Sequence, residues 1–415
     1  MHLTSTFDYL PTPEEAIILG QFGYHAYKLW NTANYERKQL KEDEPMPTAH
    51  QQQKALKDNF FYKNLPSQTA QFVLKTLDEG WKSYFELCKN EDVKNPRPPK
   101  YKHADIQFAF VQNAIQVQQD GTVRLSIPKA VKSYVFEKHH LKIDFLYLKD
   151  ERFKMFSNIK QIRFLKQSDG TYRVGVVYEV ETPQLVEDNG NYLFIDLGIK
   201  NFISAYDNTN DCSFIVGKKY LAIEQYYHKT IAHFQSISDS QQSAKGVKYP
   251  KQSKRVKKLY DKKANTLHDY LHKVTRYVVD YCKQHGISKV VIGDLTNIRK
   301  GKHYKKPENQ QLHAWPFAKL TAMLEYKLAL CGIQLIKVKE AHSSSCSPFS
   351  PMVSRGYAKK SNRKERGAYF DNGSVYNADI VGAYNIGRLA FQEGLLAHSP
   401  NISKHSLSSP LKVAV

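Results

Sequence analysis

Three short strand-like runs, each followed by an acidic residue, constrain the fold of this chain more than any other feature. NYLFIDLG, SKVVIGDL and QLIKVKE place Asp196, Asp294 and Glu340 at the ends of these runs. Near-continuous apolar runs are typical of strands buried on both faces of a sheet. Helical patterns over 218–286 and 315–331 separate them. This alternation predicts an α/β domain with one central sheet.

The N-terminal half has a different pattern. Residues 14–90 show helical spacing interrupted by prolines, and Ser67 is a candidate N-cap for the last of these helices. From about residue 105 to 182 the pattern alternates as in strands. Asp120-Gly121 and Asp169-Gly170 are hairpin signals between alternating runs. We therefore expect a small antiparallel barrel or sheet that carries the helices as an insertion.

The charge balance points to a polyanionic partner. The chain has 61 Lys and Arg against 40 Asp and Glu, a formal charge of +21. Such a balance suits nucleic acid. A ribosomal type of basic protein remains open on charge alone. The 41% hydrophobic content excludes wholesale disorder.

Cysteine usage and the absence of targeting patterns predict a cytoplasmic protein. The five cysteines are widely spaced and form no C-x-x-C pair, which favours a reducing compartment. The N-terminus lacks the basic and apolar regions of a signal peptide, and no apolar run approaches the ~18 residues of a membrane span. We expect no membrane partner.

Carboxylates gather at one edge of the predicted sheet. Asp196, Asp294 and Glu340 follow strands, and Asp379 begins the helix DIVGAYNIGRLAF. Each has an ordinary alternative, as a turn residue after a strand or a helix N-cap. Two-metal phosphodiester cleavage requires several carboxylates around a pair of Mg²⁺ ions about 4 Å apart. Several acids at one edge of a basic protein favour a nuclease.

Four segments together resemble the OrfB/TnpB family of RNA-guided nucleases, which bacterial insertion sequences encode. They are FIDLGIKNF, VVIGDLTNIRK, IQLIKVKEAHSSSC and NADIVGAYNI, and their order and spacing are quite specific. The family is related to the compact type V CRISPR effectors. The resemblance implies an α+β multidomain protein with a RuvC-like nuclease domain of the ribonuclease H type. It also implies a wedge-like antiparallel β-barrel with an inserted helical recognition domain.

The resemblance predicts the domain boundaries. The expected parts are a wedge-like β-barrel (1–13 and 101–185), a helical recognition domain (14–100), a RuvC-like nuclease domain (186–394) that contains a degenerate zinc-ribbon-like insertion (347–375), and a flexible tail (395–415).

The family cleaves DNA with three acids, and the resemblance assigns them here. Asp196 matches the first acid and Asp379 the third. The second departs from the common pattern, because Gly293 stands where many members have Glu. Glu340, on the next strand, fits a subgroup in which the acid has moved, and neighbouring strands lie only ~4.8 Å apart. Asp294 is the reserve candidate.

The resemblance implies Mg²⁺ or Mn²⁺ at these acids, but no structural zinc. Family members usually carry two C-x-x-C pairs between the second and third acids. Here the four positions hold Cys346, Phe349, Tyr369 and Asn372. One thiolate does not make a structural Zn²⁺ site, which requires four ligands.

The implied partners are a guide RNA from the chain's own element and a double-stranded target DNA, with no small-molecule substrate and a location at the prokaryotic nucleoid. Basic residues that could contact nucleic acid lie in two runs: Lys251, Lys254, Arg255, Lys257, Lys258, Arg299, Lys300 and Lys302. A solvated helix face is the ordinary alternative for the first run.

The leading functional prediction is an RNA-guided DNA endonuclease encoded by a transposable element. Gly293 and the missing ribbon cysteines leave a second possibility, an RNA-guided DNA-binding protein that does not cut and acts like a repressor. A guide-free nuclease is a third possibility, although it leaves the N-terminal half without a role.

Overall fold

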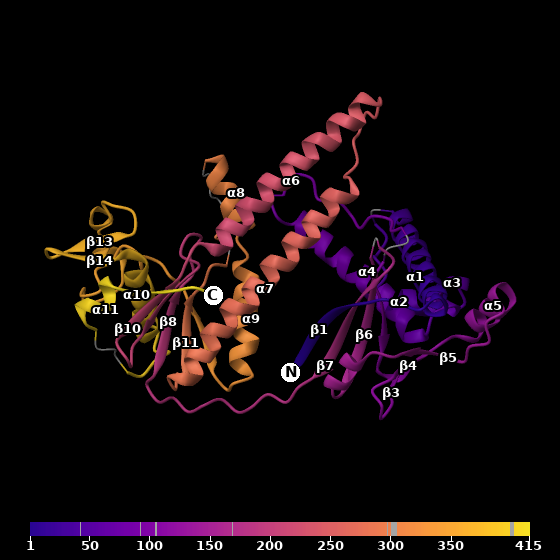
Figure 1. Ribbon diagram of the computed structural model, residues 1–415, viewed down its shortest axis with the longest axis horizontal. Helices are drawn as coiled ribbons and strands as arrows, with labels where there is room; N and C mark the ends of the chain where they lie inside the picture. Colours follow the sequence, from indigo (N-terminus) through magenta and orange to yellow (C-terminus); the bar gives the residue numbers. More distant parts are fainter. Residues whose placement is uncertain are drawn as a thin grey trace. The chain divides into compact units, whose positions relative to one another are not determined.

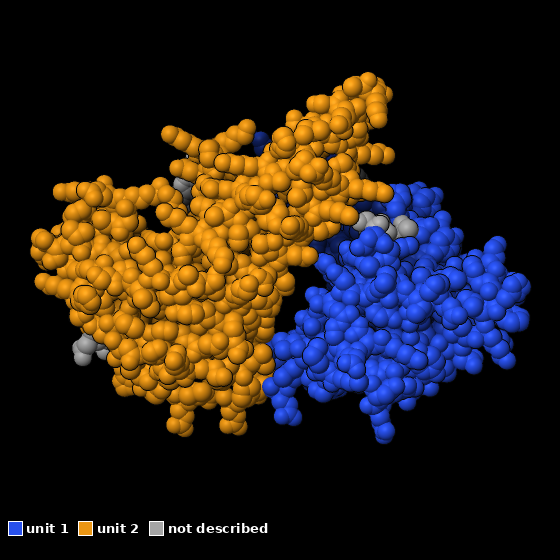
Figure 2. Space-filling view, in the orientation of Figure 1, with its two compact units in different colours: residues 1–181 blue, residues 182–415 orange. Residues whose placement is uncertain are grey.

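The computed structural model describes residues 1–415 except 42, 92, 104–105, 168, 297, 300–304 and 399–401. It divides into two compact units, residues 1–181 and residues 182–415, which Figure 2 colours separately. The α+β class with several sheets, expected from the sequence, is confirmed. In the described residues, no helix combines the length and the apolar character that crossing a bilayer requires.

Unit 1 contains two antiparallel sheets. Its strands are β1 (His2–Tyr9), β2 (Phe108–Val111), β3 (Ile115–Val117), β4 (Val123–Ser126), β5 (Phe145–Leu148), β6 (Ile159–Lys166) and β7 (Tyr172–Glu179). One sheet has the strand order β1-β7-β6-β2, and the other has the order β3-β4-β5. The hairpin signals are confirmed: β3 pairs with β4 around Gly121, and β6 pairs with β7 around Gly170. Both glycines have positive φ, as such turns require.

Helices lie between β1 and β2 in the sequence. They are α1 (Pro13–Gln39), α2 (Ala49–Ala55), α3 (Phe60–Lys63) and α4 (Ser67–Cys88), and α5 (Lys129–His139) follows β4. Helix α1 begins at a capping box, in which Thr12 and Glu15 each bind the other's backbone N–H. The prediction for Ser67 is wrong. Pro66, in an extended conformation, takes the cap position of α4, and Ser67 is the first helical residue.

Unit 2 is built on a six-stranded sheet of order β12-β11-β8-β9-β10-β15. The strands are β8 (Tyr192–Asp196), β9 (Ile203–Asp207), β10 (Cys212–Val216), β11 (Lys289–Gly293), β12 (Gln334–Val338) and β15 (Leu411–Val413). The three strands of the sequence argument, β8, β11 and β12, are parallel neighbours. Strand β9 returns antiparallel to β8 as its hairpin partner.

Helices cover both faces of this sheet. They are α6 (Lys219–Ala244), α7 (Lys254–Gln284), α8 (Lys306–Ala314), α9 (Phe317–Ala329), α10 (Ala378–Gln392) and α11 (Lys404–Ser408). Leu193 and Ile195 of β8 pack in the core with α7 and α9, whereas Tyr192 and Phe194 pack in the core with α10. Figure 1 shows α10 on one side of the sheet and α7 and α9 on the other. Strand β8 is therefore buried on both faces, as its apolar run predicts.

Helices α6 and α7 form a long pair that projects beyond the sheet (Figure 1). The long helices predicted over 218–286 are confirmed. Their predicted basic character holds for α7, whereas in α6 two lysines are balanced by Glu224 and Asp239. The aromatic ring of Phe234 on α6 lies under the guanidinium of Arg255 on α7, at 3.6 Å. Ser253 caps α7 by accepting a hydrogen bond from the backbone of Val256.

The tail was expected to be flexible from residue 395, and the structure corrects this. Residues 404–408 form α11, and residues 411–413 form β15, which pairs in parallel with β10 at the edge of the sheet. Leu407 is fully buried in the core that also contains α10. A short Ser-rich sequence carries little apolar signal, so its burial depends on the pocket that the rest of the fold provides.

Candidate active site

The structure brings the ends of β8 and β12 and the start of α10 to one place. Asp196 is the last residue of β8, and Glu340 lies two residues beyond the end of β12. Asp379 is the second residue of α10. Since β8, β11 and β12 are parallel and adjacent, their carboxyl ends meet at one edge of the sheet. The approach of Glu340 to Asp196 follows from this topology, whereas Asp379 is brought by helix α10.

Glycines allow α10 to approach β8 closely. A Cβ atom on Gly387 would lie 2.3 Å from a ring carbon of Phe194, and one on Gly382 would lie 2.7 Å from Oδ2 of Asp196. Any larger residue at these positions would push the helix or the strand away. Asp379 precedes Gly382 by three residues, about one helical turn, so the close approach brings Asp379 toward Asp196.

Asp379 is not the N-cap of α10, although it lies in the first turn of that helix. Asn377 caps α10, because its Oδ1 accepts hydrogen bonds from the backbone N–H groups of Asp379 and Ile380. The carboxylate of Asp379 instead accepts a 2.6 Å hydrogen bond from the Asn201 amide. For the carboxylate of Asp196, the structure records no hydrogen-bond donor in the residues it describes. Sequence reasoning missed Asn201, although it lies within the motif FIDLGIKNF.

Glu340 occupies the space above Gly293. A Cβ atom built on Gly293 would lie 2.1 Å from Oε2 of Glu340 and 3.2 Å from its Cβ. A side chain at position 293 and the present position of the Glu340 side chain therefore exclude each other. The Glu340 carboxylate therefore lies directly beside Gly293, at the end of the neighbouring strand.

Asp294 lies at the same edge but serves a local turn. It is exposed, and its Oδ1 accepts hydrogen bonds from the backbone N–H of Thr296 at 2.9 Å and from its hydroxyl at 2.5 Å. These bonds keep its pKa below the ordinary value. The reserve candidate is thus committed to an Asx turn.

Electrostatics distinguish Asp196 and Glu340 from the other carboxylates of this unit. Burial, with the nearby charges of Glu340 and Asp379, raises the pKa of Asp196 to about 8. Burial, with the charge of Asp294, raises the pKa of Glu340 to about 7. Strongly perturbed acids in a cleft are a recognised sign of a functional site.

Divalent-metal chemistry fits this donor set. Carboxylates that are partly withdrawn from water and close to one another, as Asp196 and Glu340 are, ionise more readily when a cation balances their charge. Mg²⁺ prefers such oxygen ligands and retains waters of its own. In the described residues, no three His, Cys, Asp or Glu side chains converge on a single point. Asp196 is the acid whose pKa is raised by the charges of both other acids.

A wide groove opens at Asp379. Its volume is about 1090 Å³, and its lining includes Asn201 and Asp379. Five cationic side chains line it: Lys200, Lys218, Arg363, Arg366 and Lys412. Desolvation, together with the nearby charges of Arg366 and Lys218, lowers the pKa of Lys200. Cations crowded around a groove that contains an active-site acid suit a phosphate backbone.

The predicted nucleic-acid contacts have different environments. Lys251, Lys254, Arg255, Lys257 and Lys258 are all exposed, at the start of α7 and just before it. Arg299 donates hydrogen bonds to the backbone carbonyls of Leu312 and Trp315, so its guanidinium already holds the end of α8. Lys300 and Lys302 lie outside the described residues.

The zinc-ribbon-like insertion is folded around hydrogen bonds. It contains a hairpin of β13 (Ala368–Asp371) and β14 (Ser374–Asn377), and two short 3-10 helices, η3 (Arg355–Tyr357) and η4 (Lys360–Asn362). At the four ligand positions, the Cys346 thiol is buried and donates to the Ser354 carbonyl, and the Tyr369 hydroxyl donates to the Ser345 carbonyl. The ring of Phe349 packs against that of Tyr376 in a tilted arrangement, with the ring centroids 5.8 Å apart.

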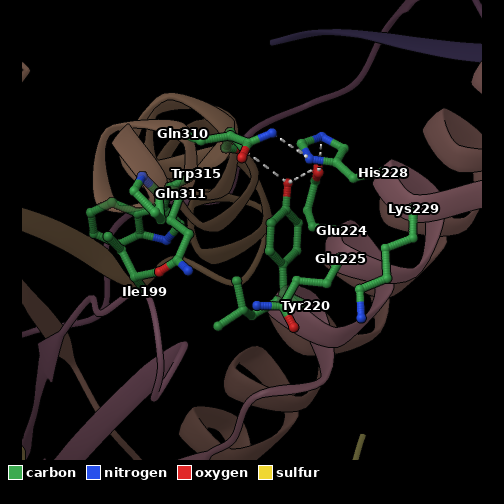
Figure 3. A pocket seen from close by; sticks show the side chains of 12 residues that line it. Ile199, Tyr220, Glu224, Gln225, His228, Lys229, Gln310, Gln311 and Trp315 are labelled. Carbon is green, nitrogen blue, oxygen red and sulfur yellow. Dashed lines mark hydrogen bonds and ion pairs between the residues drawn. The ribbon is translucent and has the colours of Figure 1, made fainter. Parts of the chain in front are cut away.

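A second, smaller cavity of about 360 Å³ lies between α6 and α8. Figure 3 shows Tyr220, Glu224 and His228 of α6 facing Gln310 of α8 across it. Several of its polar groups are paired: Glu224 binds Lys263 at 2.6 Å and His228 at 3.2 Å, and His228 contacts Gln310 at 3.0 Å. The buried indole N–H of Trp315 has no hydrogen-bond partner in the described residues. The contact between His228 and Gln310 holds α8 against α6.

Two family models match the chain. The OrfB_IS605 model, described as a probable transposase, matches residues 175–299. The model of the Cas12f1-like TNB domain matches residues 317–386. Asp196 lies in the first range, Glu340 and Asp379 lie in the second, and residues 300–316 separate the two matches.

Relatives of known name match most of the chain. TnpB-like protein ORF457 of Acidianus two-tailed virus is 24% identical over 386 residues, which cover 86% of this chain and 80% of that protein. The putative RNA-guided DNA endonuclease InsQ of Escherichia coli K12 is 23% identical over 338 residues, covering 78% of this chain and 74% of InsQ.

Among solved structures, a cryo-EM structure of a Cas12f1–sgRNA–target DNA complex shares the fold. Its Cas12f1 chain superimposes with a TM-score of 0.58 at 14% identity, covering 90% of this chain and 83% of that one. The matches extend over both units, and the motifs identified in the sequence lie within them. The chain is thus similar to TnpB-like proteins over most of its length, and its residues 175–299 match the OrfB_IS605 family model.

Proposed function

We propose that this protein is an RNA-guided DNA endonuclease with a RuvC-like nuclease domain in unit 2. The observation that carries the proposal is the position of Glu340, whose carboxylate fills the space above Gly293. Gly293 was the main reason to consider a protein that binds DNA without cutting it. With Glu340 there, the site retains three acids, and the relatives named as endonucleases support the same activity.

In this proposal Asp196, Glu340 and Asp379 hold two Mg²⁺ or Mn²⁺ ions. When bound, such ions activate water and stabilise the leaving oxygen of a phosphodiester. The chain itself supplies the carboxylates, fixes Asp379 through the Asn201 amide, and places Lys200, Arg363 and Arg366 where they can bind phosphates. Raised pKa values at Asp196 and Glu340 mean that cation binding displaces protons, so it strengthens as pH rises toward 8.

Guide RNA and target DNA are the proposed partners. The exposed basic residues at the start of α7 suit the phosphates of a guide–target duplex or of the guide scaffold. The two sheets of unit 1 would form the wedge-like part, with α1–α4 as the recognition helices. The guide would derive from the chain's own element, and the protein would act at the nucleoid.

The RNA bound to the purified protein tests whether it is guided. We expect a stoichiometric RNA of one defined sequence, whose constant part maps beside the gene that encodes this protein. Sequencing of the extracted RNA is the measurement. A heterogeneous mixture that mirrors the cell's total RNA would contradict the guided function.

The ribbon is proposed to fold without zinc, with α10 taking the place of the metal. The Asn385 amide donates hydrogen bonds to the carbonyls of Ser343 at 2.8 Å and Cys346 at 2.9 Å. Arg388 donates to the carbonyls of Ser347 and Pro348. These bonds fix the loop that carries Cys346, the one remaining cysteine of the ribbon.

Replacing Asn385 by Ala is therefore expected to lower the free energy of unfolding by about 1–3 kcal/mol, because two buried carbonyls lose their donor. The exposed Gln392→Ala, on the same helix, should have almost no effect. Thermal unfolding measures both. A zinc chelator should leave the wild-type midpoint unchanged, and a chelator-dependent fall would show that zinc holds the ribbon.

A further inference from the structure

One wall of the groove comes from a segment far along the chain from the catalytic motifs. We call residues 403–413 the edge segment; it comprises α11, β15 and the residues that flank them. Ser408, Ser409, Pro410, Lys412 and Val413 line the same groove as Asp379. No catalytic motif points to this segment, and the family models end before it, at residue 386.

The edge segment is anchored by specific contacts. The carboxylate of Asp211 accepts hydrogen bonds from the Ser406 hydroxyl at 2.7 Å and from the Ser403 backbone N–H. The Ser213 hydroxyl donates to the Ser406 carbonyl at 2.5 Å. Ser406 and Leu407 are buried. The segment is thus part of the folded unit.

The anchors also reach the ribbon. The Ser408 hydroxyl donates to the carbonyl of Val375 in β14 at 3.1 Å. The edge segment, which contains the outer strand β15, is therefore hydrogen-bonded to the β13–β14 hairpin, and this hairpin follows Arg363 and Arg366 in the sequence. Strand β15 forms one edge of the sheet, and β12 forms the opposite edge.

The register of β15 sets the direction of Lys412. In the parallel pairing of β10 with β15, Lys412 is the partner of Ile215. Residues paired across neighbouring strands share a face of the sheet. Ile215 belongs to the core that contains α10 and lines the groove, whereas Phe214 and Val216 belong to the core on the other face. Lys412 therefore lies on the face of the sheet that carries the groove and Asp379.

We infer that the edge segment contacts the nucleic acid that lies in the groove, and that the Lys412 ammonium binds a phosphate of this strand. This rests on the proposed function, because it takes the groove to be the substrate path. Lys412 would be a positioning residue: it holds the strand against the acids and takes no part in the chemistry. Lys is suited to this as a mobile point charge that contacts phosphate without reading sequence.

The salt dependence of DNA binding tests the inference. All variants are made in an Asp196→Asn background, so that the DNA is not cut, and the probe is a fluorescent oligothymidylate in Mg²⁺. Each phosphate contact with single-stranded DNA contributes about −0.7 to the slope of log K against log salt. Lys412→Ala should weaken binding and make this slope shallower by about 0.7, and Lys412→Arg should restore both.

Lys404→Ala is the matched control, because Lys404 is exposed in α11 of the same segment and does not line the groove. It should retain the slope of the Asp196→Asn parent. If Lys412→Ala and Lys404→Ala have the same slope, the inference is wrong, even if the wild type performs guided cleavage. If Lys412→Ala has the shallower slope but the wild type cuts nothing, the proposed activity is wrong and the phosphate contact stands. A parent that does not bind the probe overturns both.

Discussion

Replacing Asp196 by Asn is expected to abolish guided cleavage and to stabilise the protein in the absence of divalent cations. Shared metal ligands contribute several kcal/mol of transition-state stabilisation, so the cleavage rate should fall by about 10³-fold or more. The stabilisation follows from the crowding of carboxylates. Burial and the charges of Glu340 and Asp379 oppose ionisation of Asp196. Removing this charge should raise the free energy of unfolding at pH 8 by about 1–3 kcal/mol.

The pH dependence of stability gives the sign of this effect. The pKa of Asp196 is about 8 in the folded protein, against an ordinary value of about 4 in the unfolded chain. Between these values the native state holds the proton more tightly, so the free energy of unfolding decreases as pH rises from about 4 to 8. Asp196→Asn should flatten this dependence. Chemical denaturation in EDTA at several pH values measures it.

Asp294→Asn is the matched control for Asp196→Asn. Asp196 is the last residue of β8 and Asp294 directly follows β11 in the same sheet, but Asp294 is exposed and bonded to Thr296. It should retain cleavage within about twofold, since a surface substitution rarely exceeds about 0.5 kcal/mol. If Asp294→Asn abolished cleavage and Asp196→Asn did not, the assignment of the acids would be wrong.

Replacing Gly293 by Ala should strongly reduce the cleavage rate, because it displaces the Glu340 carboxylate. The new Cβ atom would lie 2.1 Å from Oε2 of Glu340, so the carboxylate must swing away. The end of a flexible side chain can move without unfolding the protein, whereas a ligand displaced by 1 Å or more can cost about 10² in rate. We expect cleavage to fall about 10²-fold, with a shift of less than about 1.5 kcal/mol in stability.

A swap between the two strand ends makes this prediction sharper. Glu340→Gly alone should lose cleavage. The double variant Gly293→Glu with Glu340→Gly should cleave at least about tenfold faster than Glu340→Gly, because β11 then supplies the carboxylate. Gly20→Ala is the control for glycine replacement, since its Cβ would meet no atom within 4 Å. If the double variant does not cleave and Gly293→Ala does, a carboxylate from position 293 cannot replace that of Glu340, and the prediction is wrong.

Much of unit 2 could be predicted because its strands and acids are local in sequence. Burial of β8 on both faces follows from its apolar run, and the meeting of Asp196 with Glu340 follows from parallel strands. What could not be predicted depends on contacts between distant segments. Asn201 becomes a partner of Asp379 only when α10 crosses the sheet.

The edge segment shows the same limit more clearly. A short strand has too few residues to produce a periodic pattern, and β15 is stabilised by pairing with β10 rather than by its own sequence. Ser406 and Leu407 are buried in a place that exists only in the folded unit. The roles of Asp294 and Arg299 could not be predicted from the sequence either. Each role depends on which neighbouring backbone group the side chain reaches.

The most direct test of this account is strand cleavage by the purified protein with its own bound RNA. The substrate is a DNA library that contains the sequence complementary to the guide beside a randomised flank. We predict cuts in Mg²⁺ only where the guide matches, their loss in EDTA, and their loss with Asp196→Asn, Glu340→Gln and Asp379→Asn. Guided occupancy of the target without any strand break would contradict the account and would establish a binding protein instead.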